Sequence, residues 1–297
     1  METYLLPVAI GIVVGFIARL ILLRTDFKQY PSYPQGRIIH LSIGFIASFI
    51  GAVAVPAVLE SDWTAVTFLG LAATQFRDVR KMERETLERL DSMELVKRGA
   101  PYIEGMAQAF EGRNYLVMFT SMVTVFIATI FNVWWGIAAG IVMLVIDKRY
   151  MSGKRIMHIA DIIEADVQFE GPDVYVGDIH IKNVGPEKDR QVILERAAGF
   201  IVIPKNANSV VTLAHLGQRQ AMLHHASNIL GVYRDSGEPA LVPLSKRDLA
   251  DGRIALLLFP QEKDPAQIKT VLEHVPILDS AIRLPSEAHK GKRQGNS

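Results

Sequence analysis

Three histidines on one predicted helix are the residues best suited by type to bind a metal ion. His215, His224 and His225 share that helix, and two histidines four residues apart on one helical face can both reach a zinc ion. Here the separations are nine, ten and one residues, so no pair has the required spacing. The chain has no cysteine, which removes cysteine-ligated zinc, iron–sulfur clusters, disulfides and thiol nucleophiles. The sequence therefore predicts no metal site and no cofactor.

Carboxylates and imidazoles elsewhere could support acid–base catalysis, but their arrangement does not favour it. Asp178 and His180 would face the same way along a strand, yet no serine nucleophile stands in a recognisable turn. An acidic group follows the apolar part of the chain: Glu164, Asp166, Glu170 and Asp173. We interpret this group as the electrostatic balance to Lys154 and Arg155. The sequence predicts no catalytic residue, and hence a protein that is not an enzyme.

A turn between a buried strand and a helix is the one candidate for anion binding. Free backbone N–H groups and the helix dipole favour an anion at a helix N-terminus. The candidate residues are Lys205, Asn206, Asn208 and Ser209. The same residues also suit an ordinary helix N-cap. Because no glycine-rich fingerprint accompanies them, we favour the cap over a phosphate site.

The distribution of charge along the chain predicts the elements that carry these residues. Five apolar stretches crowd into the first half: 4–23, 38–59, 63–76, 115–131 and 133–146. A membrane-spanning helix needs about 20 residues. We predict a bundle of about five transmembrane helices over residues 1–150, a small cytosolic α/β domain over 151–285, and a disordered tail over 286–297. The net charge of +1 gives no general attraction to nucleic acid.

Basic residues predict the orientation of these spans, because cytoplasmic loops carry an excess of Lys and Arg. Loop 24–37 holds Arg24, Lys28 and Arg37, whereas the connection 60–62 has no basic residue. Five spans with the N-terminus outside place every basic loop and the C-terminal domain in the cytoplasm. Stretch 63–76 is the shortest, so a re-entrant or interfacial helix stays open there. Arg19 is expected to reach the membrane interface, and His40 to lie at headgroup level.

Small residues four apart recur in three of the predicted spans and predict close helix packing. Such residues let helix backbones approach, and packing is the main attraction between helices in lipid. They are Gly11, Gly15, Gly44, Ser48, Gly51, Gly136 and Gly140. Besides the lipid bilayer, the sequence therefore predicts a protein partner or a homo-oligomer.

A charged segment, 77–113, is predicted to form a cytosolic helical hairpin between the third and fourth stretches. Pro101 is expected to end its first helix, because proline biases the preceding residue to an extended conformation. The following residues could form a lateral interfacial helix, with Tyr102, Ile103, Met106 and Phe110 toward lipid.

This segment also carries a resemblance. The run PYIEGM, followed by FEGRNY and an apolar hairpin, resembles the YIEGIA family of bacterial membrane proteins, which is named after that hexapeptide. Tyr102, Ile103, Glu104, Gly105 and Ala107 match the hexapeptide, and Met106 stands where the family has isoleucine. Because such families are associated with endospore-forming Gram-positive bacteria, the resemblance implies a role in sporulation or the spore envelope. It implies no catalytic residues.

In the C-terminal half, alternating residues predict strands over 166–170 and 174–183 that form a hairpin at a sheet edge. Helices are expected over 187–198 and 208–230, the second ending at Gly231. Buried strands are expected over 200–204 and 253–260, and Asp264 should cap a further helix.

Together these features predict a multi-pass membrane protein that acts by interaction, assembly or sensing. The alternative is a transporter or channel component whose cytosolic domain regulates it. We favour the first, because no Asp, Glu or Lys lies well inside an apolar stretch.

Overall fold

The computed structural model describes residues 2–26, 34–150, 153–233 and 241–282, so the predicted tail 286–297 lies outside the described residues. The chain divides into two compact units. The helical unit comprises residues 1–85 and 106–153, and the α/β unit comprises residues 86–105 and 154–297. A segment between two long helices therefore belongs with the C-terminal half of the chain.

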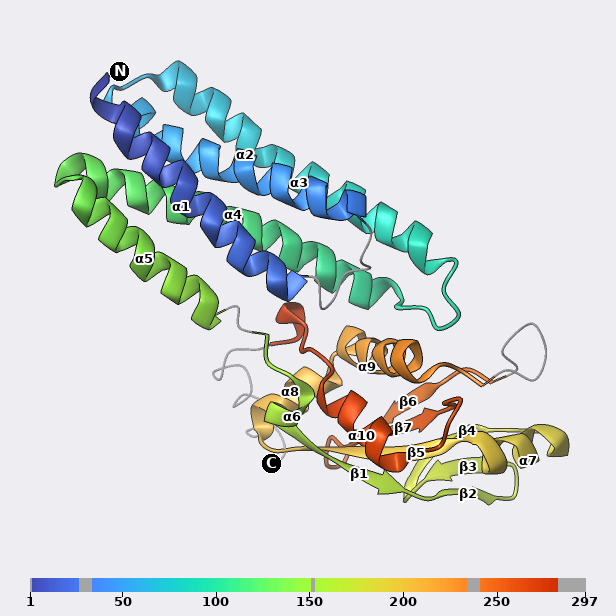
Figure 1. The fold of residues 1–297 in the computed structure, drawn as a ribbon. Helices are drawn as coiled ribbons and strands as arrows, with labels where there is room; N and C mark the ends of the chain where they lie inside the picture. The colour runs from blue at the N-terminus through green and yellow to red at the C-terminus, as the bar shows by residue number, and fades with distance from the viewer. Residues whose placement is uncertain (1, 27–33, 151–152, 234–240, 283–297) are drawn as a thin grey trace, which may run out of the picture. The chain divides into compact units, whose positions relative to one another are not determined.

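Five long helices make up the first part of the described chain (Figure 1). They are α1 (Glu2–Asp26), α2 (Pro34–Leu59), α3 (Trp63–Asp91), α4 (Ala100–Ile130) and α5 (Val133–Tyr150). Three segments of the described chain are long and apolar enough to cross a membrane: Thr3–Arg24, Gly36–Leu59 and Ala100–Ile130. Helix α3 carries a charged second half, and α5 has only 18 residues with charges in its last turn.

Tight turns join α2 to α3 and α4 to α5. Asp62 accepts a hydrogen bond from the backbone N–H of Ala65 at 3.0 Å, which satisfies one free donor at the start of α3. Asn132 accepts from the N–H groups of Trp134 and Trp135 at 3.0 and 3.1 Å and so begins α5.

The prediction of a separate interfacial helix was wrong. Pro101 stands in the first turn of α4, where its missing N–H is not needed, and α4 continues to Ile130. The side chains expected to face lipid are buried: Tyr102, Ile103, Met106 and Phe110 are at most 3% exposed.

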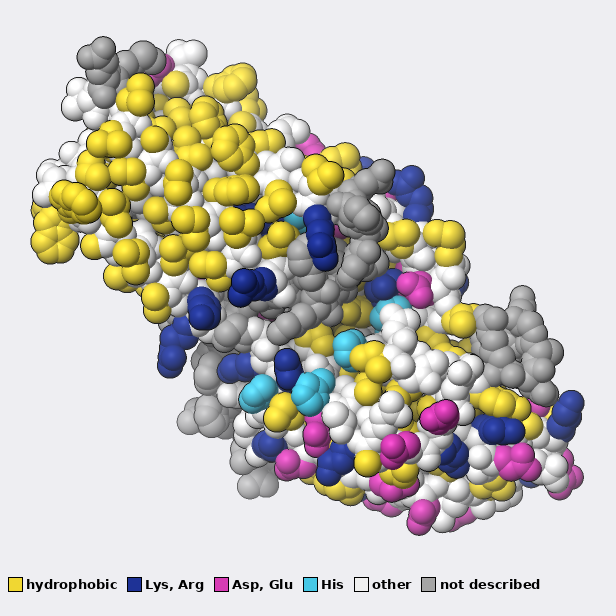
Figure 2. Space-filling model, viewed as in Figure 1, with side chains coloured by type: hydrophobic (Ala, Val, Ile, Leu, Met, Phe, Trp, Pro, Cys, Tyr) yellow, Lys and Arg dark blue, Asp and Glu magenta, His cyan; other side chains and the backbone are white. Residues whose placement is uncertain are grey.

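Large apolar side chains cover the surface of the helical unit. Figure 2 shows them spread over its visible face, whereas charged side chains are scattered over the α/β unit. Exposed examples include Leu5, Ile46, Phe68, Trp134 and Val145. Inside the unit, Leu22, Ala47, Phe76 and Val117 form a core that brings four helices together.

The α/β unit contains two antiparallel sheets. The four-stranded sheet has the order β1 (Ala160–Ala165), β5 (Ala198–Pro204), β7 (Ile254–Leu258) and β6 (Leu244–Arg247). The three-stranded sheet runs β2 (Val167–Glu170), β3 (Asp173–Val176) and β4 (Ile179–Asn183). The helices are α6 (Ile156–Ile159), α7 (Glu187–Arg196), α8 (Ala207–Ala214), α9 (Leu216–Leu230), α10 (Pro265–Glu273) and the short η1 (Asp279–Ala281).

Both faces of the four-stranded sheet are buried, which explains its continuous apolar strands. Phe200 and Leu256 point into a core shared with α8, α9 and α10. Ile201 and Leu257 point the other way, into a core shared with β3, β4 and α7. Successive strand residues face opposite sides, so both β5 and β7 must be apolar throughout.

Two details of the predicted α/β region differ. The predicted hairpin 166–183 is a three-stranded sheet of its own rather than an edge of the larger sheet. The predicted helix 208–230 is divided at His215, whose ψ of 124° is extended, into α8 and α9. The expected end at Gly231 is confirmed by its φ of 70°, and the Asp264 cap is confirmed by its hydrogen bonds to two backbone N–H groups.

Candidate functional site

The carboxylate of Asp91 connects the two ends of the loop between α3 and α4 by hydrogen bonds. Asp91 ends α3, and its Oδ1 accepts from the backbone N–H of Arg98 at 2.6 Å, while Oδ2 accepts from Gly99 at 3.1 Å. The Arg98 guanidinium lies 3.8 Å from Asp91 and 3.4 Å from Glu94. Gly99 has a φ of +79°, a conformation that only glycine adopts without cost. These contacts therefore fix the conformation of the loop that precedes the hexapeptide Tyr102–Ala107.

Helix α9 of the same unit holds this loop through His224. Its Nδ1 lies 2.7 Å from the carbonyl oxygen of Val96, and its Nε2 lies 2.9 Å from Nδ2 of Asn228. A carbonyl can only accept, so Nδ1 carries the proton of the neutral imidazole. The ring also meets Tyr102 edge-on, at 6.2 Å between centroids.

Glycines permit close approach along this contact. A Cβ on Gly217 of α9 would lie 2.7 Å from the carbonyl oxygen of Pro101, and one on Gly105 would lie 2.5 Å from the Ser280 hydroxyl. A Cβ on Gly99 would collide with the side chain of Gln220. Segment 86–105 is therefore packed closely against α9 and the residues around η1.

We expect the stability of the α/β unit to decrease as the pH falls below about 6.5, the ordinary pKa of histidine. The pKa of His224 is lowered, chiefly because the ring is buried. The charge of Arg98 also lowers this pKa. The hydrogen bond to Val96 and the charges of Glu94 and Asp91 raise it, but they do not outweigh burial. Burial also lowers the pKa of neighbouring His225. Above the pKa that histidine has in the unfolded chain, the imidazole is neutral in both the folded and the unfolded state, and the free energy of unfolding has its full value. Below that pKa the unfolded chain binds more protons, so stability is lost down to the folded pKa.

Thermal unfolding of the full chain at pH 7.5 and pH 5.5 measures this effect. The His224→Gln variant, which cannot titrate at this position, should lose less stability between the two pH values than the wild type. Equal losses in both proteins would contradict the assignment to His224.

A second group of polar side chains is buried inside the helical unit. Arg19 of α1 is fully buried and donates to His40 of α2, through Nε to its carbonyl oxygen (3.3 Å) and through Nη2 to Nδ1 (2.9 Å). Because arginine only donates, Nδ1 accepts and the proton of neutral His40 is on Nε2. That nitrogen lies 3.7 Å from Oε1 of Glu83 on α3, and Phe110 of α4 packs on both Arg19 and His40.

This group corrects one expectation. Arg19 does not extend to an interface but turns inward to His40, which is itself only 4% exposed. The sequence offered one signal, a basic residue inside an apolar run, but the partners lie 21 and 64 residues further along the chain. Asp147 of α5 was missed for the same reason: it is 1% exposed and bonded to Thr120 of α4.

The glycines predicted to mediate packing lie at helix contacts. A Cβ on Gly11 or Gly15 of α1 would collide with α4, and one on Gly51 of α2 would collide with the backbone of Met118 on α4. On α5, Gly136 lies against Ala128 and Gly140 against Val14 and Thr124. Gly44 lies against Arg19, and Ser48 is fully buried.

The residues 205–209 form an N-cap. The Asn206 side chain accepts from the N–H of Ser209 at 2.9 Å and from its hydroxyl at 3.0 Å. Lys205 is directed to Asp161 (3.3 Å) and to the carbonyl oxygen of Met157 (2.7 Å). Asn208 lies in the first turn of α8.

The remaining candidate residues do not converge on a reaction centre. Asp178 binds Arg253 through two hydrogen bonds of 2.9 and 2.7 Å, which lower the pKa of its carboxyl, whereas His180 lies 3.1 Å from Asp173. Glu164 and Asp166 line an open hollow of about 450 Å³ beside Lys263. Among the described residues, no three His, Cys, Asp or Glu side chains gather as a metal site would require.

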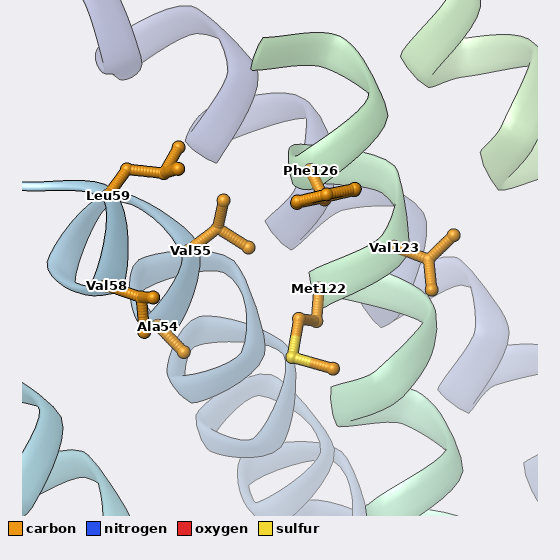
Figure 3. Close-up of a pocket in the computed structure, with 7 residues that line it drawn as sticks. All are labelled: Ala54, Val55, Val58, Leu59, Met122, Val123 and Phe126. Carbon is orange, nitrogen blue, oxygen red and sulfur yellow. The ribbon is translucent and has the colours of Figure 1, made fainter. Parts of the chain in front are cut away.

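An apolar pocket of about 260 Å³ lies between α2 and α4 (Figure 3). Its lining consists of Ala54, Val55, Val58, Leu59, Met122, Val123 and Phe126. With no polar atom to orient a substrate, this pocket suits hydrocarbon rather than chemistry.

Comparison with known proteins places these features in a family. The family described as YIEGIA protein matches residues 7–288 of the chain. The uncharacterized protein YphB of Bacillus subtilis (strain 168) is 47% identical over 292 residues, which is 98% of both chains. No solved structure matches.

Proposed function

The chain belongs to the YIEGIA protein family, and on that premise we propose that it is a five-span membrane protein that works by interaction or sensing. Its N-terminus lies outside the cell and its α/β unit in the cytoplasm. The α/β unit binds a partner or effector, and its state is passed to the membrane helices through segment 86–105.

Helix register sets the length of the proposed span of α3. Helices α2 and α3 are joined by a short turn, and Glu83 of α3 lies near His40 of α2. The two helices therefore run antiparallel over the 21 residues from Trp63 to Glu83, about 30 Å at 1.5 Å per residue. The apolar part of this length, residues 63–76, has 14 residues and is followed by Arg77, Asp78, Arg80, Lys81 and Glu83. The proposed span of α3 therefore needs its charged second half to lie at the membrane surface.

The observation that carries the coupling is the assignment of residues 86–105 to the α/β unit, although α3 and α4 continue into the helical unit. His224 and Asp91 bind the loop, and Gly217 lets Pro101 approach α9. A change in α9 would therefore act directly on the ends of two helices. The role in sporulation rests on the family's association with endospore-forming bacteria.

Topology is testable because the native chain has no cysteine. Single cysteines replacing Glu60 and Glu262 should react oppositely with an impermeant maleimide on intact cells. The first should be labelled directly and the second only after permeabilisation. Labelling of the position-262 cysteine from outside would overturn the proposed orientation.

Complementation tests the biological role. A Bacillus subtilis strain that lacks YphB should form fewer heat-resistant spores, and the present chain should restore them. The Gly217→Val variant, which forces a side chain against the Pro101 carbonyl, should fail to restore them while reaching the membrane in normal amount. Gly185→Val is the matched control, since a Cβ there meets nothing within 4 Å.

Each outcome decides a separate point. Normal spore numbers without YphB would reject the role in sporulation. Full complementation by Gly217→Val would reject coupling through segment 86–105, because the contact would then be dispensable.

A transporter or channel component is the second candidate, favoured by one observation. Ionisable residues are costly inside membranes and mark ion or substrate paths, and the helical unit buries Arg19, His40, Glu83 and Asp147. Solute or proton flux in proteoliposomes, abolished by Glu83→Gln, would establish this alternative. Absence of flux would leave the interaction proposal.

A further inference from the structure

A buried carboxylate in the helical unit has no cationic partner among the described residues. Asp147 lies in the last turn of α5 and is 1% exposed. Its Oδ2 accepts a hydrogen bond from the Thr120 hydroxyl of α4 at 3.0 Å. Its Oδ1 is buried and has no hydrogen-bond partner among the described residues. This arrangement differs from the other buried acids, because Glu83 lies near His40 and Asp91 near Arg98.

The elements packed against Asp147 supply no compensating charge among the described residues. Helices α4 and α1 pack against α5. The basic residues are Arg113 on α4, Arg19 and Arg24 on α1, and Lys148 and Arg149 on α5 itself. Arg19 is bound to His40, Arg113 is fully buried but forms no ion pair with Asp147, and Arg24, Lys148 and Arg149 are exposed. No basic side chain of the described residues forms an ion pair with Asp147.

An ionised carboxylate in this position would be doubly disfavoured. Burial of a charge without a partner is costly, and a helix C-terminus carries a partial negative charge that repels an anion. A neutral acid has neither cost. Its Oδ2 can still accept the hydrogen bond from the Thr120 hydroxyl.

We infer that Asp147 is a proton-binding site that holds its proton at neutral pH. Binding transfers one proton from hydronium to the carboxylate: one O–H bond of hydronium breaks, one O–H bond forms on the carboxyl group, and a water molecule is released. The inference deepens the proposed function, on which it rests, by naming the proton as an effector. Thr120 belongs to the same helix as the hexapeptide Tyr102–Ala107, so loss of the proton would place a charge beside the helix that carries the motif.

Infrared spectroscopy of the full chain in lipid nanodiscs tests this directly. The difference spectrum between wild type and Asp147→Asn at pH 7 should show loss of the carbonyl stretch of a protonated carboxylic acid. Loss of ionised carboxylate bands instead would overturn the inference. Should the variant fail to fold, the wild-type band can be titrated alone: it should persist at pH 7 and disappear at a higher pH.

A bound metal cation is the competing explanation, and salt exchange separates the two. Unfolding temperatures in sodium, potassium and choline chloride should be equal for the wild type. A rise with sodium or potassium that Asp147→Asn abolishes would show a metal cation and overturn the proton assignment. Thr120→Val is the matched control, which should keep the acid band but shift its frequency. The two proposals can fail separately. If the infrared band of the protonated acid is present but loss of YphB does not reduce spore numbers, the role in sporulation is rejected and the proton site stands.

Discussion

Replacing Gly51 by leucine is expected to separate α2 from α4 and to destabilise the helical unit by about 3 kcal/mol or more, the upper range for overpacking. A Cβ on Gly51 would collide with the carbonyl oxygen and carbonyl carbon of Met118. Because these are backbone atoms of a regular helix, no rotamer change can relieve the contact. Either α4 must shift or the two helices must part.

The measurement is the free energy of unfolding of the full chain in mixed micelles, together with the fraction of protein recovered folded. Gly112→Leu is the matched control: Gly112 also lies inside a helix, but a Cβ there meets nothing within 4 Å. Leucine should be neutral there, or stabilising by up to about 1 kcal/mol, because glycine is a poor helix former. Equal losses in both variants would show that the contact between Gly51 and Met118 does not decide the result.

Parts of this architecture followed from local signals. The apolar stretches predicted the helices of the first half, and the family resemblance predicted from Tyr102–Ala107 is confirmed by the match over residues 7–288. Asp264 and Gly231 identified helix ends because capping depends on neighbouring residues alone. Pro101 misled for a related reason. Proline suits both the stop before a helix and its first turn, and only the contacts of α4 decide between them.

The buried polar groups depended on partners distant in the sequence. A charged side chain near the end of an apolar run can extend to water or point into the protein. Arg19 points inward because it hydrogen-bonds to His40 and its guanidinium lies over the Phe110 ring. Strands β1 and β6 were missed for the same kind of reason. Their sequences, ADIIEA and LSKR, are short and mixed, and they become strands by pairing with the apolar β5 and β7.

The loop that carries the hexapeptide should depend most on Asp91. Replacement by alanine removes the acceptor for the backbone N–H groups of Arg98 and Gly99 and one partner of the buried Arg98 guanidinium. Breaking a buried pair in this way typically costs about 3–5 kcal/mol, because the remaining charge stays buried. Asp91→Asn should cost less, since its single carbonyl oxygen can still accept from the N–H of Arg98.

Hydrogen exchange of the full chain should show where the loss occurs. Amide exchange should accelerate at residues 96–105 in Asp91→Ala, and the strands of the four-stranded sheet should stay protected. The matched control is Asp264→Ala, because Asp264 also accepts from two backbone N–H groups but lies exposed at the start of α10. A lost cap of that kind costs about 1 kcal/mol. If the two alanine variants lose the same stability, the loop is an ordinary solvent-exposed turn. A much larger loss at Asp91 would mean that the α/β unit holds the hexapeptide through a buried, charge-assisted contact, as coupling to α3 and α4 requires.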